Sequence, residues 1–227
     1  MSLYGKGMLI TFSETPPEVE EDFNEWYNRE HIDERVWMPG FHRARRYVDA
    51  NSNADIKYFA TYETDKVEDL ADPEYMELLK DQSDWSKKVM STFTKFDRIT
   101  ANVTIDLSHG FGGACLAARF FPGIEIMSKL RDNLGDNLLP NIVSTPGIIG
   151  AVLVENNLSV VNEGRRAQGM EIPENETPEW IILIEAQDNK VLSNHGNKLI
   201  EAGLSEFELE PSDINIGVYN LMFGNNR

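Results

Sequence analysis

The spacing of hydrophobic and polar residues predicts a chain in which strands alternate with amphipathic helices. Short apolar runs rich in β-branched and aromatic residues indicate strands, and apolar positions three and four apart indicate helices. In the first half, the pattern predicts strands at 7–14, 41–50, 56–64 and 95–107, with helical segments at 16–37 and 67–81. In the second half, it predicts strands at 113–123, 148–157, 178–187 and 214–223, with helical segments at 124–145 and 189–204. The segment 67–81 is expected to break near Pro73, because proline interrupts a helix.

The two halves repeat the same order of elements at a nearly constant offset. The pair Pro146-Gly147 follows Pro39-Gly40 by 107 residues, and each pair ends a helical segment and opens a strand. Internal repetition of this length indicates two copies of one structural unit.

The repeat also shows where the second copy is longer. Glu63 and Glu185 close equivalent strands at the larger offset of 122 residues. The additional residues fall in the polar segment 163–178, which is rich in turn-forming residues. We therefore predict that 163–178 is a mobile loop, where an insertion disturbs the repeated elements least.

The element order βαββαβ is that of a ferredoxin-like unit. A four-stranded sheet with both helices on one face leaves its other face bare, and two such halves can bury those faces together. We predict an α+β fold of two tandem ferredoxin-like halves that close into an intrachain pseudo-dimeric α+β barrel. The halves are residues 1–109, which carry the candidate site, and residues 110–227, which form a scaffold.

A family resemblance enters at residues 23–47. This segment holds an aromatic pair, a histidine on the same helix and a Pro-Gly turn that opens a strand: Trp26, Tyr27, His31, Pro39, Gly40 and Phe41. The combination resembles the dimeric α+β barrel superfamily, especially its EthD-like and stress-responsive members. The resemblance implies a ligand cleft between the sheet and its helices, or within the barrel. The superfamily includes isomerases, polyketide cyclases, small monooxygenases and heme enzymes, so the fold does not select the activity.

His31 and Tyr27 lie four residues apart and can share one helical face. Histidine can act as a general base near neutral pH, and tyrosine can orient or protonate a substrate oxygen. Arg46, on the following strand, can stabilise developing negative charge. We assign these three residues as catalytic, with a structural histidine and surface ion pairs as the alternatives. The positions 107 residues after Tyr27 and His31 are both leucine, so the sequence predicts a single site on the first half.

The residues assigned to substrate binding are Trp26, His42, Arg43, Tyr58, Tyr62 and Trp85. Strand alternation places Arg43 on one face of its strand and Arg46 on the other, together with His42. Tyr58 and Tyr62 share a face of the next strand and can line a cavity, although core packing is the ordinary role of such aromatic residues.

Cofactor and metal motifs are not found. The sequence has no paired-histidine or paired-cysteine metal motif, no glycine-rich dinucleotide fingerprint and no phosphate-binding loop. A heme would need an axial histidine, and His195 stands on a predicted helix of the second half. The residues around His195 are polar, unlike a heme wall. We therefore predict no cofactor and no metal.

Net charge and composition limit the kinds of molecule that the protein is expected to bind. The 227 residues carry a net charge of −17, from 38 acidic and 21 basic residues. Such a surface repels nucleic acid and anionic membranes. The N-terminal residues turn polar too early to be expected as a signal peptide, and no apolar run approaches the ~20 residues of a membrane span. The single cysteine, Cys115, lies in an apolar run and is expected in the core. We predict a cytoplasmic protein that binds a small molecule and leave open whether two chains form a homodimer.

These observations lead to three functional hypotheses. The first is a cofactor-independent acid–base enzyme of the isomerase, cyclase or lyase type, acting on a small organic acid or an aromatic metabolite. The second is a non-catalytic barrel that binds a small ligand or is associated with stress. The third is a heme- or oxygen-dependent enzyme.

Overall fold

The computed structural model describes residues 3–52, 54–167, 169–193, 200 and 203–227. The strands are β1 (Gly7–Glu14), β2 (Phe41–Asp49), β3 (Tyr58–Thr64), β4 (Lys95–Asp106), β5 (Ala114–Phe120), β6 (Ile148–Asn156), β7 (Trp180–Ala186) and β8 (Asn215–Asn226). The helices are α1 (Glu20–Trp26), α2 (Ile32–Val36), α3 (Pro73–Lys80), α4 (Asp84–Met90), α5 (Met127–Asn133), α6 (Leu139–Val143), α7 (Leu158–Ala167) and α8 (Asn189–Val191).

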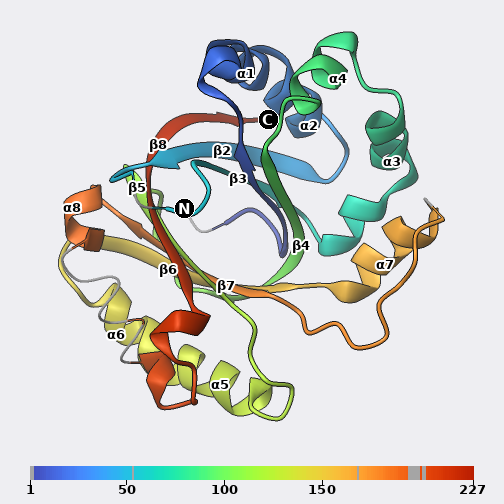
Figure 1. The fold of residues 1–227 in the computed structure, drawn as a ribbon. Helices are drawn as coiled ribbons and strands as arrows, with labels where there is room; N and C mark the ends of the chain where they lie inside the picture. Colours follow the sequence, from blue (N-terminus) through green and yellow to red (C-terminus); the bar gives the residue numbers. More distant parts are fainter. Residues whose placement is uncertain (1–2, 53, 168, 194–199, 201–202) are drawn as a thin grey trace.

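The eight strands form one closed antiparallel barrel in the order β1-β3-β2-β8-β5-β7-β6-β4 (Figure 1). The first four strands form a sheet of order β4-β1-β3-β2, and the last four repeat it as β8-β5-β7-β6. The two sheets join edge to edge, through β2 with β8 and β4 with β6. The predicted tandem ferredoxin-like fold and its closure into a barrel are therefore confirmed. The division into functional and scaffold halves at residue 109 stays a prediction.

Side-chain alternation assigns one face of each strand to the barrel interior and the other to the helices. On β1, Met8, Ile10 and Phe12 enter the interior cluster, whereas Leu9 packs with the helices. Phe12 stacks on Phe59 in the interior, with ring centroids 5.2 Å apart. The barrel interior is thus a packed apolar core, and ligand space lies under the helices.

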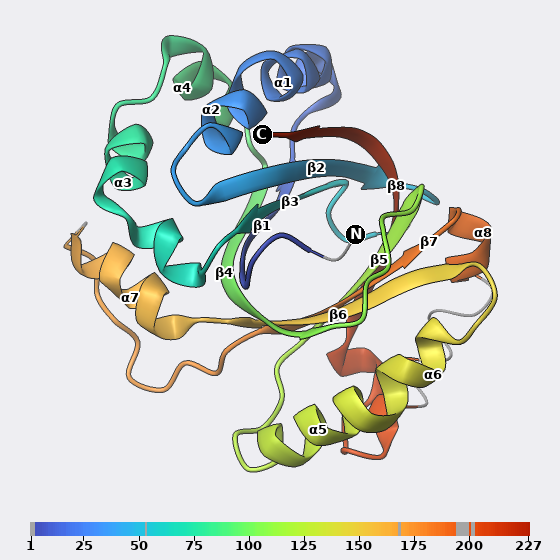
Figure 2. The ribbon, with the colours of Figure 1, turned by 180° about the vertical axis from the view of Figure 1, so that it is seen from behind.

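Helices α1 to α4 cover one outer side of the barrel, and α5 and α6 cover the opposite side (Figures 1 and 2). Each half has a long helix interrupted by a π-helical turn, at Tyr27–His31 between α1 and α2 and at Leu134–Leu138 between α5 and α6. The two turns are 107 residues apart, the offset of the repeat. Gly40 and Gly147, with φ of +80° and +90°, follow these helices at the same offset and adopt a conformation that favours glycine.

The segment 163–178 is a loop over most of its length, as predicted, because residues 170–178 hold no helix or strand. Its first residues instead belong to helix α7, which contacts the helical turn Val67–Ala71 that leads into α3. Val160, near the start of α7, is buried in the helical core of the first half. This helix was not predicted because the residues that it packs against lie in the other half of the chain.

The other helical segments were predicted in part. The break at Pro73 is confirmed, because the Asp72 side chain accepts a hydrogen bond from Glu74 N at 2.9 Å and begins α3. Helix α4 was not predicted as a separate element. The expected helix 189–204 lies partly outside the described residues. No helix among those described is both long and apolar enough to cross a membrane.

A buried ion network connects the two halves at one end of the barrel. The Arg45 guanidinium contacts Glu63 at 3.2 Å and also pairs with Glu185 of the second half. Glu63 accepts a hydrogen bond from the backbone N–H of Tyr4, and Glu185 accepts one from Gly112, each at 2.9 Å. These two contacts are equivalent in the repeat. Arg45 therefore compensates two buried carboxylates, one from each half.

Replacing Arg45 with methionine is expected to destabilise the protein by about 3–5 kcal/mol, because buried Glu185 loses the arginine that pairs with it and Glu63 keeps only Arg43. The matched control is Arg29→Met, which removes an exposed pair with Glu25 and should cost less than about 1 kcal/mol. Urea unfolding of both variants measures the difference. Equal losses would contradict a structural role for the Arg45 network.

Candidate functional site

A cavity of about 540 Å³ lies between the outer face of the first-half sheet and the helices that cover it. Strands β1, β3 and β4 form its floor, and α1, α3, α4 and the first π turn form its walls. Helix α7 of the second half also lines it, through Val160, Val161, Gly164 and Arg165. The volume lies within the range of small-molecule sites in proteins.

The π turn places an aromatic cluster on the cavity wall. The rings of Tyr27 and His31 have centroids 4.8 Å apart, and those of Trp26 and His31 are 4.1 Å apart. Because a π turn brings residues i and i+5 together, Trp26 is the nearer neighbour of the histidine. Trp26 is fixed from behind by a hydrogen bond of 3.0 Å from its Nε1 to Ser86 Oγ.

Four buried polar atoms of cavity-lining residues have no hydrogen-bond partner within the described part of the chain. They are Thr11 Oγ1, Thr100 Oγ1, Tyr62 OH and His31 Nδ1. Buried polar groups in folded proteins are almost always paired. Four unpaired groups on residues around one cavity give it hydrogen-bonding capacity that the described part of the chain does not use.

The sheet register explains how the floor is built. Leu9 of β1 is flanked by Tyr62 of β3 and Thr100 of β4, and the next outward residue of β1, Thr11, stands opposite Arg98. Residues directly opposite on antiparallel strands point to the same face. The hydroxyl groups and the arginine thus lie in two adjacent rows under the aromatic wall.

The electrostatic environment keeps His31 neutral. Burial lowers the pKa of His31 well below its ordinary value of 6.5, and the positive charges of Arg35 and Arg46 lower it further. Burial also raises the pKa of Tyr62 well above its ordinary value. At neutral pH the cavity therefore presents an unprotonated imidazole, which can accept a proton, and a protonated phenol, which can donate a hydrogen bond.

Arg46 lies behind this wall and does not line the cavity. Its guanidinium stands over the Tyr27 ring, with 4.1 Å between Cζ and the ring centroid. It also donates hydrogen bonds to Asn28 Oδ1 at 2.7 Å and Asn24 Oδ1 at 2.8 Å. Burial lowers the pKa of Arg46. The contacts fit a residue that positions Tyr27, and they do not bring the guanidinium to the cavity.

The predicted site residues thus divide into two sets. Trp26, Tyr27, His31 and Tyr62 line the cavity. The others make contacts elsewhere: His42 with Asp65, Arg43 with Glu63 at the end of the barrel, Tyr58 with Glu20, and Trp85 with Asp22. Tyr58 shares a strand face with Tyr62 but lies at the opposite end of β3.

The remaining lining residues were not predicted. Tyr75 and Met76 come from α3, Met90 from α4, Phe93 from the segment that leads into β4, and Phe96 from the start of β4. Strand alternation around Thr100 could have identified one more, Arg98. Nothing in the sequence could have placed α7 on the cavity.

The equivalent space of the second half is filled with side chains. Leu134 and Leu139 from its long helix pack against Phe120 and Trp180 of the sheet, all fully buried. The cavity therefore occurs on the first half, as the sequence predicted from the leucines at the equivalent positions.

No known family matches the chain, and no curated protein matches its sequence. Solved structures do match its fold. An anthrone oxidase-like protein shares 12% identity over 97% of this chain and 92% of its own, with a TM-score of 0.70. A candidate monooxygenase from Lactobacillus acidophilus shares 10% identity over 97% and 96%, with a TM-score of 0.60. A candidate chlorite dismutase shares 12% identity over 96% of each chain, with a TM-score of 0.55.

At these identities the likeness shows the fold alone, so the predicted resemblance is confirmed at the level of a barrel built from two ferredoxin-like halves. The EthD-like subtype stays a prediction. The names of the three neighbours all denote oxidative or oxygen-related chemistry. The expected isomerase, cyclase or lyase is therefore wrong in its reaction class, although the names favour an enzyme.

The residues present do not fit a heme. A histidine that binds a metal usually donates its other ring N–H to an acceptor, which fixes the ring. Among the described residues, His31 is the histidine that lines the cavity, and its Nδ1 has no hydrogen-bond partner there. The corresponding space of the second half is packed with apolar side chains. His195, considered as an axial ligand, lies outside the described residues.

Replacing Tyr62 with phenylalanine is expected to change the melting temperature little, because its hydroxyl has no protein partner. The matched control is Tyr219→Phe, whose hydroxyl donates a hydrogen bond of 3.1 Å to the carbonyl oxygen of Ile56 and should cost about 1 kcal/mol. Thermal and urea unfolding compare the two. A larger loss for Tyr62→Phe would show that its hydroxyl supports the fold.

The lowered pKa of His31 predicts a pH dependence of stability. The unfolded chain binds a proton at His31 below about pH 6.5, whereas the folded chain does not until lower pH. The folded state should therefore lose up to about 1.4 kcal/mol per pH unit from this residue as the pH falls below 6.5. His31→Gln should show a flatter profile in urea unfolding between pH 7.5 and 5.5. The contribution of His31 is the difference between the wild-type and His31→Gln profiles, and identical profiles for the two proteins would contradict a neutral His31.

Proposed function

We propose that this chain catalyses the oxygen-dependent oxidation of a flat, hydroxylated aromatic molecule in the cavity beside His31. The observation that carries the proposal is a neutral histidine in an aromatic cavity whose floor holds unpartnered hydroxyl groups. The neighbours named as an anthrone oxidase-like protein and a monooxygenase support an oxidative reaction.

The lining supports an aromatic substrate. Trp26, Tyr27, Tyr75 and Phe93 all face the cavity, and aromatic rings bind flat ligands by stacking and edge contacts. A protein cavity of this kind is mostly apolar, with few polar groups that set the orientation of the ligand. Thr11, Thr100 and Tyr62 can supply that orientation through hydrogen bonds to substrate oxygens.

The chemistry follows from the two titratable groups. Neutral His31 removes a proton from an activated carbon or a phenol of the substrate. Tyr62 stays protonated and stabilises the resulting oxyanion by a hydrogen bond. The electron-rich substrate anion then reduces dioxygen. In the overall reaction, a methylene carbon loses two hydrogens and gains one oxygen atom as a carbonyl, and the second oxygen atom leaves with those hydrogens as water.

Helix α7 contributes by covering the cavity. Val160 and Val161 place apolar surface over the site, which limits the access of water to a reactive anion. The site draws on both halves of a single chain, so this proposal does not need a second copy. Formation of a homodimer and a cytoplasmic location stay predictions.

Anthrone is the first probe, with oxygen uptake measured at an electrode and anthraquinone measured by absorbance. We expect one molecule of oxygen consumed per anthraquinone formed. His31→Gln should lower kcat/KM by about 10²- to 10⁴-fold, because it removes the general base. His109→Gln, outside the cavity, should keep the wild-type rate. Unchanged turnover in His31→Gln, or no uptake above the uncatalysed rate with anthrone and its hydroxylated derivatives, would refute the proposal.

A further inference from the structure

The cavity has a charge opposite to that of the whole molecule. The chain has 38 acidic residues and 21 basic ones. The described residues that line the cavity nevertheless include no aspartate or glutamate, and they include four cations: Arg35, Lys80, Arg98 and Arg165. A lining cation favours an anionic ligand where no carboxylate of the protein already pairs with it.

Three of the four cations already have carboxylate partners. Arg35 pairs with Glu34, Lys80 with Glu77 and Arg165 with Glu176. Arg98 differs from these three cations because it has no carboxylate partner among the described residues. Its side-chain contact is a long hydrogen bond of 3.4 Å from NH2 to Tyr75 OH, and it makes no ion pair. Arg98 is thus the lining cation that remains available to a ligand.

The neighbours of Arg98 complete a set of hydrogen-bond donors. Thr11 stands directly opposite Arg98 across the β1–β4 ladder, and Thr100 is the next residue on the same face of β4. Both threonine hydroxyls are buried without a partner in the described structure. A carboxylate only accepts hydrogen bonds and can take them from an arginine and a hydroxyl together.

We propose that the natural substrate is an aromatic acid whose carboxylate binds Arg98 and Thr11, while its ring system lies against Trp26 and His31. The proposal rests on the proposed function, because it places the acid in the same cavity. Arg98 is then a specificity-determining residue that fixes the position of the ring relative to the base.

Binding of oxidised ligands tests this inference separately from turnover. The probes are anthraquinone-2-carboxylate and its neutral carboxamide, measured by isothermal titration calorimetry. The wild type should prefer the acid. Arg98→Gln should weaken binding of the acid about tenfold, as expected for the loss of one charge-assisted hydrogen bond, and should change binding of the amide less than about twofold. Thr11→Val, which removes a hydroxyl and no charge, should weaken binding of the acid by a smaller factor.

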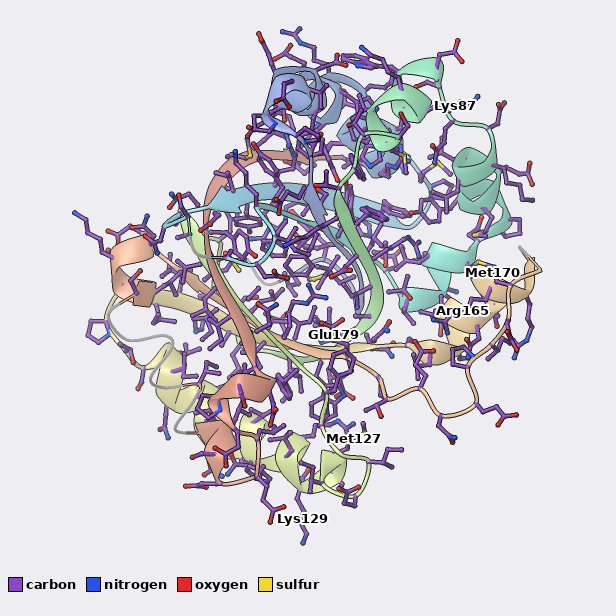
Figure 3. All side chains as sticks on the ribbon, in the orientation of Figure 1. Lys87, Met127, Lys129, Arg165, Met170 and Glu179 are labelled. Atoms are coloured by element: carbon purple, nitrogen blue, oxygen red, sulfur yellow. The ribbon has the colours of Figure 1, made fainter. Side chains whose placement is uncertain are left out.

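Lys129→Gln is the matched control for net charge. Lys129 is exposed on α5, well away from Arg165 and α7 in the view of Figure 3, so this variant should bind both probes as the wild type does. Equal affinity for acid and amide in the wild type, or equal effects of Arg98→Gln and Lys129→Gln on the acid, would overturn the inference. Arg98-dependent binding of the acid without oxidation of anthrone would support the inference and reject the proposed reaction.

Discussion

The structure depends on the closure of an eight-stranded sheet on itself. Pairing of β2 with β8 and of β4 with β6 leaves no free strand edge. Closure commits one face of every strand to an interior that side chains fill completely. The helices then lie outside, and the cavity beside His31 lies in the layer between sheet and helices. The Arg45 network links the two halves where the barrel closes, with one buried cation serving a carboxylate from each half.

The repeat separates what the fold requires from what the site requires. Both halves keep the π turn and the glycine that follows the long helix, at the same offset. In the second half the turn carries leucines that fill the space against the sheet. In the first half the same turn carries Tyr27 and His31 and borders a cavity. The π turn is thus part of the scaffold, and the chemistry comes from the residues placed on it.

The second half is more than a scaffold, because it also contributes residues to the cavity of the first half. Helix α7 belongs to the second half but lines the cavity of the first. Its apolar residues cover the site, and Arg165 contributes to a lining that is cationic in an otherwise acidic protein. An aromatic wall, a neutral imidazole and a row of hydrogen-bond donors together favour an electron-rich aromatic ligand that carries negative charge.

The sequence by itself determined the order of the strands, the two-fold repeat and the barrel. It also determined the cluster of Trp26, Tyr27 and His31, because these follow from local periodicity and from the comparison of one half with the other. Only the tertiary structure decided that Arg46 stands behind Tyr27 and does not line the cavity. It also decided that α7, more than sixty residues beyond Arg98, closes the site. Such contacts depend on how the sheet curves and closes, and a pattern read along one strand or helix does not contain that information.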